Sequence, residues 1–202
     1  MKLLLILPLL FGACSSAQVP RVAQANVSTP APERTPDETF VRDIDRLSKI
    51  AGLPTLRSSN LSQGDVEARV WYGFGLILLE GFAIKRTHNE WSAFHLKADE
   101  ANPRYITQVA RIQLPAPKSG WKQCWQRLAD AGILTLLSGT EGPDPDVEAF
   151  YVETKAGDSY RNYQYISPEY EQSPNAKRML AIGDIISEEF GLKRFHVTKP
   201  SQ

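Results

Sequence analysis

Nucleophilic catalysis is the first chemistry to consider in this chain, which has two cysteines and three histidines. Cys124 shares one face of an expected helix with three apolar residues, Trp121, Trp125 and Leu128. In a catalytic interpretation its thiolate would attack a substrate, with His95 or His196 as the general base. Apolar neighbours, however, raise the pKa of a thiol and keep it unreactive. We therefore expect Cys124 to be a buried core residue.

The three histidines are scattered, with His88 in an expected turn, His95 in an expected strand and His196 near the end of the sequence. The sequence contains neither HxxxH nor HExxH, spacings that place two zinc ligands on one helix face. The glycine-rich stretch GFGLILLEG also lacks the GxGxxG spacing of a dinucleotide-binding turn. We therefore predict no catalytic residue, no metal ligand and no cofactor.

Four carboxylates crowd the segment GTEGPDPDVE, namely Glu141, Asp144, Asp146 and Glu148. Alternating carboxylates can supply oxygen ligands to calcium. The EF-hand pattern fails here because Ala149 stands where that loop needs a glycine for its sharp turn. We interpret the segment as a solvated acidic loop, with a weak calcium site as the alternative.

The stretch SYRNYQYIS is the strongest candidate for binding. In a strand, Arg161, Tyr163 and Tyr165 alternate onto one face. If exposed, this stripe would suit a sugar ring or a partner protein, since arginine and tyrosine are enriched at binding hot spots. These residues are therefore a candidate binding surface, and the alternative is that Tyr163 and Tyr165 form the buried face beneath a helix.

Charge and composition limit the partners. The 202 residues include 23 basic and 23 acidic ones, without a basic cluster. Contacts to phosphates need concentrated lysine and arginine, so we expect no nucleic-acid partner. The 42% of apolar residues is ordinary for a globular protein and too low for one that crosses a membrane many times.

The N-terminus has the features of an export signal. Lys2 precedes an apolar run over residues 3–11. As a helix this run spans about 14 Å, roughly half of a bilayer's hydrocarbon core, which suits a signal peptide and not a membrane span. Two small residues, Gly12 and Ala13, then lead into Cys14.

Small residues that end at a cysteine resemble the lipobox of bacterial lipoproteins, and the resemblance covers residues 1–16. It departs from the usual pattern at Phe11, where the family has leucine. The resemblance implies that residues 1–13 are a signal peptide, that Cys14 carries a diacylglycerol and an acylated amine (palmitate), and that this lipid anchors the chain in a membrane. Ser15 then favours the periplasmic face of an outer membrane. The alternative is a secretory signal cut after Ala17, which would release a soluble periplasmic or secreted protein.

The remaining chain divides into a tether and one domain. Residues 14–35 contain three prolines and no aromatic residue, so we expect a disordered tether. Every aromatic residue outside the signal lies between Phe40 and Phe195, so residues 36–199 are predicted to form a single domain. In an oxidising compartment two exposed thiols tend to form a disulfide. If Cys14 carries a lipid it cannot form one, so we expect Cys124 to remain a free thiol that is protected by burial.

Hydrophobic periodicity and turn residues predict the elements of that domain. Helices are expected over residues 36–51, 119–131 and 174–190. Strands are expected over residues 66–74, 82–87, 91–97, 105–114, 147–155 and 159–166. The order α-ββββ-α-ββ-α, with short links between strands, predicts an α+β fold in which about six antiparallel strands carry about three helices on one face.

Three functions fit these observations. The first is a lipid-anchored envelope protein whose domain binds an envelope protein or glycan, or has a structural role, without catalysis. The second is a hydrolase of envelope polymers or peptides, although no nucleophile and base motif supports it. The third is an inhibitor or accessory module that acts through an exposed hairpin.

Overall fold

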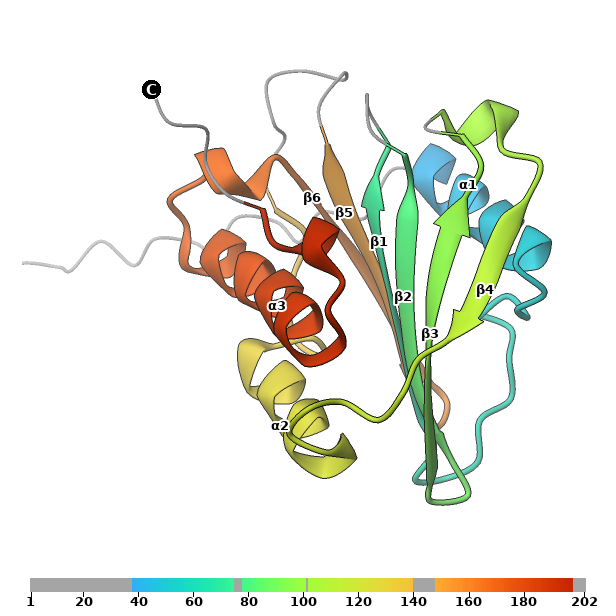
Figure 1. Cartoon of the computed structure of the whole chain (residues 1–202), viewed down its shortest axis with the longest axis vertical. Coiled ribbons are helices and arrows are strands. Elements are labelled where there is room, and N and C mark those ends of the chain that lie inside the picture. The colour runs from blue at the N-terminus through green and yellow to red at the C-terminus, as the bar shows by residue number, and fades with distance from the viewer. Residues whose placement is uncertain (1–37, 75–77, 101, 140–147, 198–202) are drawn as a thin grey trace, which may run out of the picture. The chain divides into compact units, whose positions relative to one another are not determined.

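A six-stranded antiparallel sheet is the centre of the structure, a computed structural model that describes residues 38–74, 78–100, 102–139 and 148–197 (Figure 1). Within these residues the strand order is β4-β3-β2-β1-β5-β6. The strands are β1 (Val66–Gly73), β2 (Glu80–Thr87), β3 (Glu90–Ala98), β4 (Val109–Gln113), β5 (Ala149–Ala156) and β6 (Ser159–Ile166). Strands that follow one another along the chain pair directly, except that the chain leaves β4 at one edge and returns as β5 beside β1.

Three α-helices and three short 3-10 helices complete the described elements. They are α1 (Glu38–Ile50), η1 (Pro103–Tyr105), α2 (Trp121–Ala131), η2 (Pro168–Tyr170), α3 (Pro174–Phe190) and η3 (Lys193–Phe195). The predicted α+β fold and its order α-ββββ-α-ββ-α are therefore confirmed. No helix in the described part of the chain is both long enough and apolar enough to cross a membrane.

The third helix begins and ends where its sequence signals predict. The Ser173 hydroxyl accepts a hydrogen bond from the Ala176 N–H at 3.1 Å, and Pro174 occupies the first turn, where its missing N–H costs nothing. Gly191 ends the helix with a φ of 73°, in the left-handed region that glycine adopts most readily. These local signals fix where α3 lies in the sequence.

The helices cover both faces of the sheet, which corrects the expectation that they pack on one face. In Figure 1, α2 and α3 lie on one side of the sheet and α1 lies on the other. Ile44 and Leu47 of α1 belong to one core cluster with Trp71 and Tyr151. The opposite cluster joins both other helices to the sheet through residues that include Val70, Phe150, Leu128 and Met179. The central strand β1 is buried along all eight residues, so both of its faces need cover.

Candidate functional site

The prediction that Arg161, Tyr163 and Tyr165 of β6 form a binding surface is wrong, because two of these three side chains are buried. Tyr163 and Tyr165 are each 1% exposed, on the face of the sheet that α2 and α3 cover. Their hydroxyls donate hydrogen bonds to the carbonyl oxygens of Ile133, at 3.0 Å, and Leu137, at 2.6 Å. Arg161 is exposed. The alternative, that Tyr163 and Tyr165 form the buried face beneath a helix, is therefore confirmed. The hypothesis of an inhibitor or accessory module that acts through this hairpin depended on an exposed stripe, which the structure does not have.

Cys124 is a core residue, as expected. Its side chain is fully buried between α2 and the sheet, in the same cluster as Leu128. Burial raises the pKa of the thiol to about 12; nearby Glu189 raises it further and Arg127 opposes the shift. Trp121 and Trp125, which share the same helix face, are only partly buried.

Cys124 is expected to resist thiol reagents in the folded protein. In a Cys14→Ser variant it is the single cysteine, and with a pKa near 12 its thiolate at pH 8 should be about a thousandfold scarcer than that of an ordinary thiol. Ellman's reagent should therefore label the native variant slowly and the guanidinium-unfolded variant rapidly. A native rate within tenfold of the unfolded rate would contradict the core assignment.

The histidines do not assemble a catalytic group. His95 Nε2 lies 2.8 Å from Glu80 Oε2, and the Arg194 Nε lies 3.4 Å from the other oxygen of that carboxylate. His196 instead pairs with Asp184, and His88 lies exposed in the β2–β3 turn. β3 and β6 are separated by three strands, so His95 and Arg161 do not meet. Among the described residues no group of three or more His, Cys, Asp or Glu side chains is placed to hold a metal ion.

Two other predicted features lie outside the described residues. Cys14 is one of them, so its lipidation stays a prediction. Most of the acidic segment is the other, since Glu141, Asp144 and Asp146 are not described. Glu148, at its end, accepts a hydrogen bond from the Tyr72 hydroxyl.

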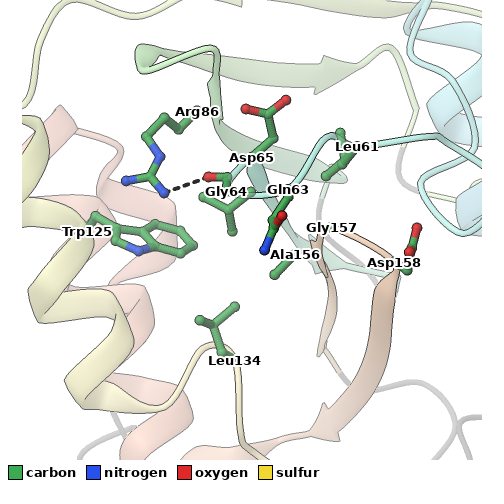
Figure 2. A pocket seen from close by; sticks show the side chains of 11 residues that line it. Leu61, Gln63, Gly64, Asp65, Arg86, Trp125, Leu134, Ala156, Gly157 and Asp158 are labelled. Atoms are coloured by element: carbon green, nitrogen blue, oxygen red, sulfur yellow. Dashed lines mark hydrogen bonds between the residues drawn. The ribbon is translucent and has the colours of Figure 1, made fainter.

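A cavity of about 610 Å³ opens between α2 and one end of the sheet (Figure 2). Four segments that are distant in the sequence form it: the loop before β1, the end of β2, the β5–β6 turn and α2 with the chain that follows it. In Figure 2, Trp125 and Leu134 face Gln63, Gly64 and Ala156 across the opening. Its volume lies within the range of roughly 300–1,000 Å³ that is usual for sites of small organic ligands.

Asp65 holds the rim of this cavity together. Its carboxylate Oδ1 accepts a hydrogen bond from the His88 N–H at 2.9 Å, and its backbone oxygen accepts one from the Gly157 N–H at 3.2 Å. His88 and Asn89 both have positive φ, at 51° and 66°, as a tight two-residue hairpin turn requires. Through its carboxylate and its backbone oxygen, the buried Asp65 therefore joins the start of β1 to two hairpin turns, so that the rim is formed before any ligand arrives.

Arg86 forms the polar wall of the cavity. One terminal nitrogen donates to the Gly64 carbonyl oxygen at 2.6 Å, and the guanidinium carbon lies 5.3 Å from the centre of the Trp91 ring, within range of a cation–π interaction. The Nε is buried and has no hydrogen-bond partner among the described residues. A buried donor without a partner costs free energy, and because this nitrogen has almost no accessible surface it is not a donor that the cavity offers to a ligand.

Three of the four tryptophans gather beside Arg86. The Trp91 ring lies 6.3 Å from the Trp121 ring, with an angle of 4° between their planes, and 5.5 Å from the Trp125 ring. Trp121 lines a second, shallower hollow of about 480 Å³ at the start of α2. We call Trp91, Trp121 and Trp125 the tryptophan cluster.

Comparisons with protein-family models, curated proteins and solved structures found no match to this chain. The site is therefore interpreted from its own chemistry. A preformed cavity with an aromatic wall and a few polar groups suits binding. Sequence reasoning assigned Trp125 to the core and did not single out Arg86 or Asp65. No local motif could have identified them, since the cavity exists only when four distant segments meet.

Proposed function

We propose that this chain is a lipid-anchored bacterial envelope protein whose domain binds a ligand in the cavity between α2 and the sheet. The cavity carries the binding half of the proposal, because it combines a preformed rim, the Trp125 wall and the polar wall formed by Arg86. The lipobox-like residues that end at Cys14 support the anchor.

The anchor is tested by Cys14→Ser. Cells that express the wild-type chain and are fed radiolabelled palmitate are expected to label it, and the variant should lose the label completely because it lacks the acceptor thiol. The Cys124→Ser variant is the matched control and should label like the wild type, since that thiol is buried. Equal labelling of wild type and Cys14→Ser would mean that the chain is not a lipoprotein.

The binding half is tested with the full-length protein, purified in detergent, and envelope extract separated into glycan, peptide and lipid fractions. At saturation one fraction is expected to raise the Tm of the wild type by about 5 °C or more, because a ligand that binds only the folded state stabilises it. Arg86→Ala should reduce this shift. If no fraction raises the Tm, the domain does not bind an envelope ligand.

A further inference from the structure

We propose that β4 is a contact between two copies of this chain, which pair their β4 strands antiparallel about a two-fold axis and so join their sheets edge to edge. The proposal concerns a part of the domain away from the cavity and does not depend on what the cavity binds. Three features of β4 support it: its open outer edge, the direction of its backbone groups and the order of its side chains.

The two edges of the sheet, β6 and β4, differ in how the described residues cover them (Figure 1). At β6, the Gln164 carbonyl oxygen accepts a hydrogen bond from the Gly139 N–H at 2.9 Å, and the Gln164 N–H donates to the Ser138 hydroxyl at 3.3 Å. The chain that follows α2 therefore lies along part of that edge. On the outer side of β4 no described segment is hydrogen-bonded to the strand, and its last four residues are all exposed. Such an edge is a ready template for another strand.

The backbone of β4 shows which groups a second strand would meet. Alternate residues of an edge strand turn their N–H and C=O groups toward the neighbouring strand and away from it. The Leu114 N–H, directly after β4, donates to the Ala93 carbonyl oxygen of β3 at 2.9 Å. Ile112, two residues earlier, therefore also turns its backbone groups toward β3. The N–H and C=O groups of Arg111 and Gln113 point outward, where a second strand can pair with them.

The side chains of β4 are complementary to themselves in one antiparallel register. Centred on Ile112, this register places Ile112 opposite its own copy, Arg111 opposite Gln113, and Ala110 opposite Leu114. The apolar pairs then share one face of the joined sheets, and Ile112, which is 49% exposed, gains cover. A register centred on Arg111 would instead bring two arginines face to face, and like charges directly opposite each other are destabilising.

Arg111 leaves the edge accessible, although a charge on an edge strand usually opposes pairing. Its guanidinium carbon lies 5.1 Å from the centre of the Phe94 ring, and one terminal nitrogen donates to the Gly52 carbonyl oxygen at 3.3 Å. The side chain is therefore folded back over its own sheet. Because β4 is short, we expect a small interface that dissociates with a Kd on the order of 10 μM. Anchoring both copies in one membrane would raise their effective concentration.

Cysteine cross-linking of the full-length protein, in detergent at about 50 μM, tests this register. Under mild oxidation Ile112→Cys should form a disulfide with its own copy, because opposite residues of a non-hydrogen-bonded pair have Cα atoms about 4.5 Å apart. Arg111→Cys and Gln113→Cys should not cross-link when each is alone, but should do so when the two are mixed. Tyr105→Cys is the matched control, at a position that is 68% exposed and outside β4. The wild type measures the background from the two native cysteines.

Gln113→Pro separates pairing from folding. The Gln113 N–H points away from β3, so proline there should change the Tm by less than about 3 °C while reducing the Ile112→Cys cross-link at least about tenfold. Cross-linking of Ile112→Cys no faster than that of Tyr105→Cys, or cross-linking that Gln113→Pro leaves unchanged, would overturn the proposal. Efficient cross-linking of Arg111→Cys alone would contradict the register. A disulfide in cells between Ile112→Cys and a different protein, without a homodimer, would also overturn the proposal, because this edge would then serve another partner.

Discussion

Gly183→Ala is expected to destabilise the protein by about 3 kcal/mol or more, although alanine is the better helix former by roughly 1 kcal/mol. Gly183 lies inside α3 and is fully covered. A Cβ at this position would lie 2.2 Å from the Phe195 carbonyl oxygen and 3.4 Å from the Phe150 ring. The first of these is a backbone atom, which cannot rotate away as a side chain can.

Relief of this contact would require η3 to move away from α3. That movement would withdraw the fully buried Phe195 from the core and pull Arg194 away from the Leu78 carbonyl oxygen, to which it donates at 2.9 Å. We expect the Tm to fall by about 6–12 °C, as 3 kcal/mol does in a domain of this size. Lys177→Ala, on the exposed side of the same helix, should change stability by less than about 0.5 kcal/mol. If Gly183→Ala raises the Tm, helix propensity outweighs the contact and this account of the α3–η3 packing is wrong.

The elements with local signals were predictable from the sequence. Ser173, Pro174 and Gly191 delimit α3 through capping chemistry that acts within a few residues, and the β5–β6 hairpin follows from strand alternation around Gly157. Alternation also placed Tyr163 and Tyr165 correctly on one face of β6. It does not reveal what covers that face, and here the cover is supplied by α2, α3 and the chain that follows α2.

The position of α1 could not be inferred in the same way. The β1 residues that face α1 include Glu67 and Arg69, charged residues that strand alternation alone assigns to solvent. In the fold they are 7% and 0% exposed, because they pair with each other and because the Ser48 hydroxyl and the Pro54 carbonyl oxygen accept hydrogen bonds from Arg69. A buried ion pair therefore has the sequence signature of an exposed face. The cavity could not be predicted from the sequence for a related reason, since its walls meet only through long-range packing.

Burial of Glu153 causes the second large effect, a loss of stability on going from pH 4.5 to pH 7. Glu153 on β5 lies directly opposite Arg69 on β1 and is 1% exposed. Burial raises its pKa to about 7, while Arg69 and the hydrogen bond from the Tyr160 hydroxyl, at 3.0 Å, lower it. Its Oε2 has no hydrogen-bond partner among the described residues, so the protonated carboxyl is the form that this site tolerates best.

The sign follows from linkage between protonation and folding. In the unfolded chain the carboxyl ionises near its ordinary pKa of about 4.5, whereas in the folded protein it keeps its proton up to about pH 7. The stabilisation from Glu153 is therefore complete below pH 4.5 and is lost as the pH rises through about 7. At about 1.4 kcal/mol per pKa unit, the contribution to the free energy of unfolding is about 3 kcal/mol. Asp45 and Glu67 add to the shift, since their negative charges oppose ionisation of a third carboxyl.

Glu153→Gln removes this titration while keeping a side chain of nearly the same shape. The variant is expected to match the wild type near pH 4.5 and to exceed its free energy of unfolding by up to about 3 kcal/mol at pH 8, measured by urea denaturation across that range. Tyr160→Phe should move the wild-type transition to higher pH, because it removes a hydrogen bond that favours the ionised form. If the wild type and Glu153→Gln show parallel stability profiles from pH 4.5 to pH 8, Glu153 is ionised throughout, and Arg69 compensates the buried charge more fully than the desolvation argument allows.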